Sequence, residues 1–403
     1  MTTMSWFWIL PPALALIYSW TAELFLFLWW ESTFLRKGAI TQRLVVTIAC
    51  VATILAPQHD HQALLVVKIS ILLISLYFLY DTRTQVVQGG PPPPFHTPSS
   101  SSSRVIVITG ANTGIGKETA RLLASEHTTI IIACRSVVKA QQAVDDIRQQ
   151  ILKARIECVE MDLSSLTSVR NAARQLQQKY PVIDVLINNA GLMHAQYELT
   201  QDGYEQVFQV NHLGHYLWTR LLLPSVLRSP NPKIINVTSS TYILGTREKS
   251  QNNTTVFPFH DLQCNQGRAY TLFGQYGVSK LANIYFTMSL AQKYTNIQCC
   301  AVHPGLVRTD VVRNMPWYLR YPNQIFGWLI QALQKTPTQG AWGTVHATNM
   351  NVQSGLYWVN RKPQPLRGVT PIQVSEEAEQ LWMESAKLVQ LPPQDNVGLA
   401  SKQ

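Results

Sequence analysis

A short β-branched run leads directly into a glycine-rich turn and then into a helix, and this junction constrains the fold more than any other feature of the chain. The run 104–109 is apolar on both faces, which is typical of a strand buried in a parallel sheet. The turn has the spacing G-x-x-x-G-x-G, not the more common G-x-G-x-x-G. Glycines allow a pyrophosphate to approach the backbone, and the free N–H groups of the following helix attract an anion. The sequence therefore predicts a dinucleotide-phosphate site at Gly110, Asn112, Thr113, Gly114, Ile115 and Gly116.

Strands and helices alternate repeatedly after this junction, which predicts an α/β fold with a doubly wound parallel sheet. Together with the first strand, the later ones would complete a Rossmann sheet of about seven strands. They are expected at 128–134, 155–161, 183–187, 233–237, 297–302 and 354–361, followed by an amphipathic helix at 375–391.

The residues at the ends of the second and third predicted strands indicate which dinucleotide binds. The second strand ends at Arg135, where NAD-binding units usually carry an acidic residue that holds the ribose hydroxyls. An arginine can instead pair with the 2′-phosphate of NADP, so the sequence favours NADP(H) over NAD. A surface arginine without a cofactor role is the alternative. The third strand ends at Asp162 and Leu163, where the acid can accept a hydrogen bond from the adenine amino group.

The spacing Tyr276-x-x-x-Lys280 places a phenol and an ammonium group one helical turn apart on the same face. A tyrosine with a pKa of about 10 is a poor proton donor or acceptor at neutral pH. The charge of Lys280 is expected to lower the pKa of Tyr276 and so make it a proton-transfer group. A lone Tyr-x-x-x-Lys is usually structural, and its interpretation depends on the motifs that precede it.

Four motifs occur in order: T-G-A-N-T-G-I-G at 109–116, N-N-A-G at 188–191, T-S-S at 238–240 and Y-G-V-S-K at 276–280. This series resembles the short-chain dehydrogenase/reductase family, and several stretches, such as S-K-L-A-N from residue 279, are similar to its retinol-dehydrogenase-like branch. The resemblance extends from residue 104 to residue 391. It implies an oxidoreductase that transfers a hydride between NADP(H) and a lipophilic alcohol, aldehyde or ketone of retinoid, polyprenoid or steroid type.

The resemblance also implies roles for individual residues. Tyr276 would be the acid/base, Lys280 would stabilise its tyrosinate and hold the nicotinamide ribose, and Ser240 would hydrogen-bond the substrate oxygen. Ser239 is the alternative for this hydroxyl. Asn211, inside a long helix predicted at 207–223, resembles the family's asparagine that holds a water molecule in a proton relay. Further cofactor contacts are implied at Asn189, Ala190, Gly191, Pro304, Gly305, Val307 and Thr309.

Two long segments of the predicted catalytic domain carry no assigned element. Residues 241–273, between the serines and the tyrosine, form an insertion whose course the pattern does not predict. Residues 315–328 are rich in Trp, Tyr and Phe and occupy the place where the family builds its substrate lid. Ordinary core packing is the alternative for these aromatic side chains, and contact with a bilayer would let a lipophilic substrate enter directly.

Residues 1–80 carry only seven formally charged side chains and are predicted to form a membrane anchor of two or three transmembrane helices. The stretch 5–30 exceeds the roughly 20 residues that a spanning helix needs. The stretches 44–56 and 63–80 are expected to form a hairpin of two spans, with a buried or interfacial pair as the alternative.

Basic residues indicate how this anchor is oriented. Arg36, Lys37 and Arg43 place the first loop in the cytosol, and a hairpin of two spans then returns the chain to the same side. The Pro/Ser-rich stretch 81–103 is a tether, and the NADP-binding domain occupies 104–403. We therefore expect a multi-pass protein of the endoplasmic reticulum or another endomembrane, with its catalytic domain facing the cytosol.

Composition excludes several classes of protein. With 46% hydrophobic residues, 11 Trp, 15 Tyr and 12 Phe, the chain is not a disordered one. Its six cysteines show neither a C-x-x-C pair nor zinc spacing, so we predict no metal site. The net charge of +10 is compatible with membrane lipid, a phosphorylated cofactor or nucleic acid as a partner, or with an ordinary solvated surface, and charge alone does not choose among them. No basic cluster points to nucleic acid. A homodimer is compatible with the resemblance. The competing function is an NADP(H)-binding membrane scaffold or redox sensor without turnover, against which the combination of Ser240, Tyr276 and Lys280 argues.

Overall fold

The computed structural model describes residues 103–246, 248–249, 255–308, 334–366 and 371–393. The predicted membrane anchor, the linker up to residue 102, the aromatic-rich segment 315–328 and Thr309 lie outside this part of the chain. Within the described ranges, no helix combines the length and the apolar character that crossing a membrane requires.

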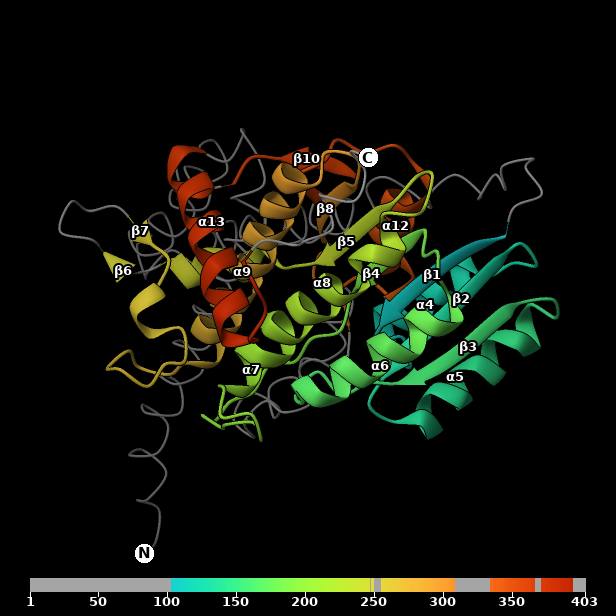
Figure 1. The fold of residues 1–403 in the computed structure, drawn as a ribbon, viewed down its shortest axis with the longest axis horizontal. Helices are drawn as coiled ribbons and strands as arrows, with labels where there is room; N and C mark the ends of the chain where they lie inside the picture. Colours follow the sequence, from blue (N-terminus) through green and yellow to red (C-terminus); the bar gives the residue numbers. More distant parts are fainter. Residues whose placement is uncertain (1–102, 247, 250–254, 309–333, 367–370, 394–403) are drawn as a thin grey trace, which may run out of the picture. The chain divides into compact units, whose positions relative to one another are not determined.

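An eight-stranded sheet forms the centre of the described domain (Figure 1), with the strand order β10-β9-β8-β5-β4-β1-β2-β3. All neighbouring strands are parallel except the pair β9 and β10. Most residues of β1 and β2 are buried, as a parallel sheet covered on both faces requires. The Rossmann-type α/β sheet predicted from the sequence is confirmed. The strands are β1 (Arg104–Thr109), β2 (Thr128–Cys134), β3 (Arg155–Glu160), β4 (Val185–Asn188), β5 (Lys233–Val237), β8 (Gln298–His303), β9 (Leu356–Val359) and β10 (Lys362–Gln364).

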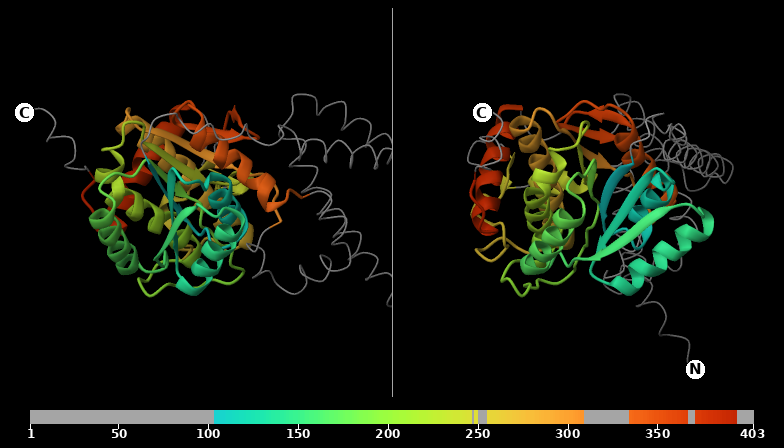
Figure 2. Two further views of the ribbon diagram at one scale, coloured as in Figure 1. Left: turned by 90° about the vertical axis from the view of Figure 1, so that its right-hand side faces the viewer. Right: turned by 45° about the vertical axis from the view of Figure 1, so that its right-hand side comes forward.

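Helices cover both faces of this sheet (Figure 2). Helices α4, α5 and α12 share one apolar core with the sheet, to which Ile106, Ile130 and Ala143 belong. Helices α6, α8 and α9 cover the other face, and α13 packs against α9. Their bounds are α4 (Gly114–Leu123), α5 (Val137–Gln150), α6 (Leu166–Lys179), α8 (Gly214–Val226), α9 (Leu272–Lys293), α12 (Pro337–Asn349) and α13 (Pro371–Leu388).

The last predicted strand, 354–361, is instead a hairpin. Asn360 and Arg361 have φ values of 49° and 64°, which turn the chain between β9 and β10. The sequence pattern predicted only one strand in this region. The sheet therefore has one strand more than expected.

The helix after β4 contains one π turn, whereas the sequence predicted a regular helix at 207–223. The helix α7 (Gln206–Phe208), the π turn η1 (Gln209–Leu213) and α8 follow one another directly. Asn211 lies at the centre of the π turn. Single π turns inside α-helices are frequent at functional sites.

The insertion between the serines and the tyrosine is built mostly of short elements. It begins as the 3-10 helix η2 (Ser240–Thr246) and continues through the antiparallel pair β6 (Glu248–Lys249) and β7 (Thr255–Val256). A 3-10 turn, η3 (Phe259–Asp261), then precedes α9. The insertion therefore leaves the carboxyl end of β5 and returns to the helix that carries Tyr276.

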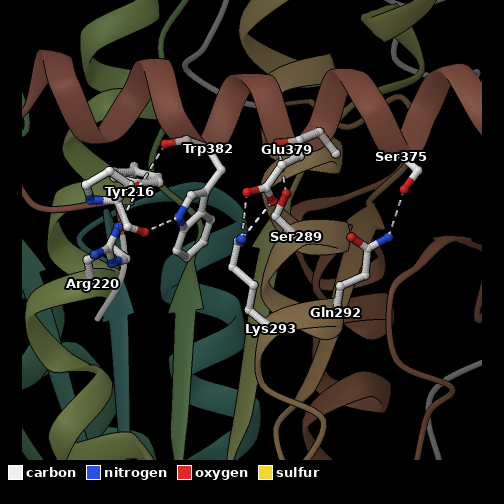
Figure 3. A network of polar contacts seen from close by, with 10 residues as sticks. Tyr216, Arg220, Ser289, Gln292, Lys293, Ser375, Glu379 and Trp382 are labelled. Carbon is white, nitrogen blue, oxygen red and sulfur yellow. Dashed lines mark hydrogen bonds and ion pairs between the residues drawn. The ribbon is translucent and has the colours of Figure 1, made fainter. Parts of the chain in front are cut away.

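The C-terminal helix α13 lies across α8 and α9 (Figure 3). Trp382 is 2% exposed and packs edge-on against the ring of Tyr216, with centroids 5.2 Å apart. The guanidinium of Arg220 lies 4.8 Å from the centre of the Trp382 ring. At the other helix, Lys293 forms an ion pair of 2.7 Å with Glu379. Aromatic and cationic contacts thus attach α13 to the face of the domain opposite α4 and α5.

Candidate active site

The predicted motifs converge at the carboxyl ends of β1, β4 and β5. Thr109 ends β1, Asn188 ends β4 and Val237 ends β5, and these strands are neighbours in the sheet. Because parallel strands end at the same edge, the segments that follow them meet there. The structure therefore brings the glycine turn, the N-N-A-G segment and the T-S-S segment together.

The glycine turn packs tightly against the segment after β4. Gly110 has a φ of +66°, and a Cβ at this position would lie 2.9 Å from the Cα of Ala190. A Cβ on Gly116 would lie 2.5 Å from Nδ2 of Asn189, which donates a hydrogen bond of 2.9 Å to the carbonyl of Thr109. The turn leads into the N-terminus of α4, a helix of ten residues. Its close backbone approach and free helix N–H groups fit a pyrophosphate.

Thr109 begins the T-G-A-N-T-G-I-G motif but was not among the predicted site residues, and it holds these two segments together. Its buried Oγ1 accepts hydrogen bonds from the N–H groups of Asn189 at 2.9 Å and Ala190 at 3.0 Å. The same oxygen lies 2.8 Å from Nε2 of His215, whose pKa burial lowers to about 4. The position of Thr109, the last strand residue before Gly110, is the sequence signal for this role.

The residues predicted to select the dinucleotide follow β2 and β3. Arg135 is exposed directly after β2, so its guanidinium is accessible to a phosphate. Asp162 is half-buried after β3, and its Oδ1 accepts hydrogen bonds from the N–H (2.9 Å) and the hydroxyl (2.7 Å) of Ser164. Leu163 is buried, and a Cβ on Gly214 would lie 2.8 Å from its carbonyl oxygen. Strand β2 lies beside β1, and β3 lies beside β2, so these residues continue the edge that carries the glycine turn.

Asn211 lies beside Lys280 and the end of the N-N-A-G segment. Its Oδ1 accepts a hydrogen bond of 2.8 Å from the N–H of Leu192, and its Nδ2 donates to the Leu192 carbonyl at 3.0 Å. The same Nδ2 donates to Oγ of Ser279 at 2.9 Å. A Cβ on Gly191 would lie 3.1 Å from Nζ of Lys280 and 3.3 Å from Oδ1 of Asn211. Three predicted site residues, Gly191, Asn211 and Lys280, therefore form one cluster.

Tyr276 and Lys280 lie one turn apart in α9, with Nζ of Lys280 5.4 Å from the centre of the Tyr276 ring. Loss of hydration raises the pKa of Tyr276, and a hydrogen bond with Ser239 only partly opposes this rise. The lowered pKa expected from the sequence is therefore wrong, because desolvation of the phenolate has the largest effect on this pKa. Burial also lowers the pKa of Lys280 to about 8, and its Nζ donates a hydrogen bond of 3.2 Å to the carbonyl of Val237. At neutral pH this arrangement keeps Tyr276 protonated and most of Lys280 charged.

A hydrogen bond with Ser239, the alternative that the sequence left open, acts on the pKa of Tyr276. Ser240 is the next residue and begins η2. The preceding Thr238 donates a hydrogen bond of 2.8 Å to the carbonyl of Lys280, which fixes this segment against α9. The structure thus brings Ser239 to Tyr276, and the role of Ser240 stays a prediction.

Pro304, Gly305 and Val307 follow β8, at the same edge of the sheet. The Nζ of Lys335 donates hydrogen bonds to the carbonyl of Pro304 at 3.2 Å and to Oδ1 of Asn360 at 2.6 Å. Gly305 has a φ of +91°, and a Cβ there would lie 2.9 Å from this nitrogen. Val307 also forms a parallel β-bridge with Lys335. Lys335 was not among the predicted residues, because no local spacing connects it with the segment that it holds.

The chain is similar to known proteins along this domain. The model of the short chain dehydrogenase family matches residues 104–250. Retinol dehydrogenase 12 of Mus musculus is 37% identical over 291 residues, which are 71% of this chain and 86% of that protein. Polyprenol dehydrogenase of Homo sapiens is 33% identical over 296 residues, covering 71% of this chain and 84% of that protein. The crystal structure of an uncharacterized protein from Mycobacterium Paratuberculosis is similar with a TM-score of 0.56 and 28% identity, covering 77% of this chain and 99% of that one.

Proposed function

Because the chain belongs to the short-chain dehydrogenase family, we propose that it interconverts a lipophilic alcohol and its aldehyde or ketone with NADP(H) as cofactor. The family makes it an oxidoreductase of the alcohol dehydrogenase type. The names of its relatives support a lipophilic substrate, since retinol and polyprenol are both apolar alcohols. The observation that carries the proposal is the contact of Ser239 with Tyr276, one helical turn from Lys280, whose ammonium group lies beside Gly191.

The site suits the reducing direction, in which NADPH supplies a hydride to the carbonyl carbon. Tyr276 donates its phenolic proton to the carbonyl oxygen, which becomes the hydroxyl of the product. Its raised pKa keeps this proton in place at neutral pH. The Ser239 hydroxyl orients the oxygen, and the charge of Lys280 stabilises the tyrosinate that remains.

The residues grouped at this edge of the sheet would hold the cofactor. The glycine turn from Gly110 to Gly116 fits the pyrophosphate, and Asp162 fits the adenine. The segments 189–191 and 304–307, with Lys280, lie where they would contact the nicotinamide half. Asn112, Thr113, Ile115, Leu163 and Thr309 remain cofactor contacts by prediction, and Asn211 remains a catalytic residue by prediction. Ser240 is the competing candidate for the hydroxyl role that is proposed here for Ser239.

Arg135 provides the test of cofactor preference. Replacing it by aspartate removes a charge-assisted pair with the 2′-phosphate and supplies an acceptor for ribose hydroxyls. We expect Arg135→Asp to raise the KM for NADPH by about tenfold to a hundredfold and to lower the KM for NADH. Steady-state kinetics with both cofactors measures this change. An unchanged ratio of the two KM values would assign Arg135 to the surface.

The test of the activity is NADPH oxidation by the detergent-solubilised full chain with retinal, a polyprenal, a sterol ketone and short aldehydes. We expect turnover of a long-chain carbonyl and its loss in Tyr276→Phe, which lacks the proton donor but keeps the ring. Thermal stabilisation by NADPH in both proteins would show that the variant still binds the cofactor. Equal turnover by the variant would refute the role of Tyr276. NADPH binding without turnover of any substrate would favour a scaffold or redox sensor.

We also propose that residues 1–80 anchor the protein in the endoplasmic reticulum or another endomembrane, with the catalytic domain in the cytosol. The support is the charge-poor composition of this segment and the three basic residues in its first predicted loop. An anchored enzyme would meet its lipophilic substrate in the bilayer.

A further inference from the structure

A chain of buried polar side chains joins the helix that carries Asn211 to the helix that carries Tyr276. It begins at Glu205, which is 0% exposed and directly precedes α7. The carboxylate of Glu205 accepts hydrogen bonds from the N–H groups of Val207 at 2.8 Å and Phe208 at 2.7 Å. It therefore caps the N-terminus of the helix in which Asn211 lies.

Gln275 connects this carboxylate with α9. Its side chain is fully buried, and it immediately precedes Tyr276. Its Nε2 donates hydrogen bonds to Oε2 of Glu205 at 2.7 Å and to the carbonyl of Leu262 at 3.1 Å. Its Oε1 accepts a hydrogen bond of 2.5 Å from the guanidinium of Arg268. Both N–H donors and the oxygen of this amide are thus in use. Helices α7 and α9 lie side by side at this point (Figure 1).

Arg268 and Asp261 extend the same chain into the insertion. The carboxylate of Asp261 accepts hydrogen bonds from the N–H groups of Asn265 at 2.7 Å and Arg268 at 3.0 Å. The guanidinium of Arg268 also donates to the carbonyl of Asp261 at 3.1 Å. From the same turn, Oε1 of Gln263 accepts a hydrogen bond of 2.6 Å from the N–H of Glu205. The insertion therefore binds Glu205 at its backbone, while α9 binds it at its carboxylate.

Electrostatics makes the amide of Gln275 the critical link in this chain. Burial raises the pKa of Glu205, and the hydrogen bonds from Val207, Phe208 and Gln275 oppose that rise. On its other side, Gln275 accepts from the positive charge of Arg268. A side chain that cannot both donate and accept leaves a buried carboxylate or a guanidinium without one partner, which is costly in the protein interior.

The start of the insertion, in η2, packs closely against the backbone of α9 at Gly277. A Cβ on Gly245 of η2 would lie 2.5 Å from the backbone carbon of Gly277, and a Cβ on Gly277 would lie 2.6 Å from the carbonyl of Thr241. Contacts of the insertion thus reach both residues that flank Tyr276, which are Gln275 and Gly277. This close packing fixes the position of the first turns of α9 against the insertion.

We propose that Glu205 and Gln275 are positioning residues. They hold Tyr276 at a fixed position relative to Asn211 and Ser239. They act through the first turns of α9, without touching the reacting atoms. The proposal rests on the proposed function, because it takes Tyr276 as the acid/base. It gives the insertion a role in catalysis, since the turn around Asp261 supplies the outer half of the hydrogen-bonded chain.

An exchange of amide and carboxylate across this contact tests the proposal in the full-length, detergent-solubilised protein. Glu205→Gln places two amides in contact, and Gln275→Glu places two carboxylates in contact. The double variant restores one donor and one acceptor and presents the new carboxylate to Arg268. We expect each single variant to lower kcat by about tenfold to a hundredfold, as a small misplacement of a catalytic group does. The exchange leaves one capping N–H and the carbonyl of Leu262 without a partner, so the double variant should recover kcat only in part and lose clearly less than the product of the two single losses. The KM for NADPH should be unchanged throughout.

Asn283→Leu is the matched control for Gln275→Leu. Both substitutions remove a buried amide from α9, and Asn283 lies two turns beyond Tyr276, beside His212. We expect both to lower the melting temperature, but only Gln275→Leu to lower kcat and to shift its pH profile. Two outcomes would overturn the positioning role and leave the proposed function intact. One is a kcat loss in the double variant equal to the product of the two single losses. The other is an equal kcat in Gln275→Leu and Asn283→Leu. A wild-type protein without turnover of any carbonyl would overturn the proposed function and this role together.

Discussion

Tyr276 and Lys280 show how the local environment sets protonation at the scale of single residues. Desolvation raises the pKa of the phenol, and burial lowers the pKa of the ammonium group to about 8. Carbonyl reduction needs a protonated Tyr276 and a charged Lys280. Both conditions hold below about pH 8, and the charge of Lys280 is lost as the pH rises through this value.

We therefore expect kcat for NADPH-dependent reduction to be constant near neutral pH and to fall at alkaline pH, with a midpoint at about 8. Single-turnover or steady-state rates across this range measure it. Lys233→Met is the control, because Lys233 is also buried and its pKa is also lowered to about 8, but it lies at the start of β5. The Lys233→Met variant should still show the fall in kcat at alkaline pH. A kcat that rises with pH would contradict the assigned roles.

The two neighbouring serines offer a second test at this scale. Ser239 contacts Tyr276, whereas Ser240 begins η2. Removing a hydroxyl that orients the reacting oxygen should cost about a hundredfold in kcat. We expect this loss in Ser239→Ala and a change of less than about threefold in Ser240→Ala. Rates of both variants with one carbonyl substrate decide the matter, and the reverse order would restore Ser240 as the catalytic hydroxyl.

Residues whose roles depend on local spacing were predictable from the sequence, and those that depend on distant contacts were not. Gly110 must adopt a positive φ in a turn between strand and helix, and the turn is visible in the sequence itself. Tyr276 and Lys280 share a helix face by their spacing alone. In contrast, Lys335 holds Pro304 across 31 positions of sequence. Gln275 depends in the same way on a carboxylate 70 positions earlier.

At the scale of elements, the sequence pattern predicted the central strands and their alternation with helices, but not the irregularities of these elements. A π turn adds one residue to a helix and leaves its apolar face nearly unchanged, so the pattern around Asn211 did not show it. The hairpin of β9 and β10 was missed because two non-glycine residues take a positive φ at its tip. The insertion has almost no periodicity of its own, because its polar side chains bind partners in other elements.

The attachment of α13 leads to a stability prediction. Trp382→Ala would leave a cavity between α8 and α9 and would remove the aromatic partner of the buried Arg220. We expect a loss of about 3–5 kcal/mol in unfolding free energy. The neighbouring Met383 is 44% exposed, so Met383→Ala should change it by less than about 0.5 kcal/mol. Thermal unfolding of both variants measures the difference, and equal melting temperatures would show that α13 docks by other contacts.

At the scale of the whole molecule, the chain combines a dehydrogenase domain with a charge-poor segment of 80 residues. The retinol and polyprenol dehydrogenases match 71% of the chain. The anchor is predicted from composition alone, because a spanning helix needs only a long apolar run. If residues 1–80 anchor the protein as proposed, substrate and enzyme share the surface of one membrane.

Sharing a membrane makes a kinetic prediction for the full-length protein in phosphatidylcholine vesicles. The amounts of protein and of a long-chain carbonyl are held constant while the amount of lipid is raised. More lipid dilutes the carbonyl within the bilayer, so the rate of NADPH oxidation should fall in inverse proportion to lipid once the substrate is below saturation. The rate with a short, water-soluble aldehyde should stay constant in the same vesicles, and Tyr276→Phe gives the background. A long-chain rate that does not depend on lipid would mean that the substrate reaches the site from water, and that the anchor serves location alone.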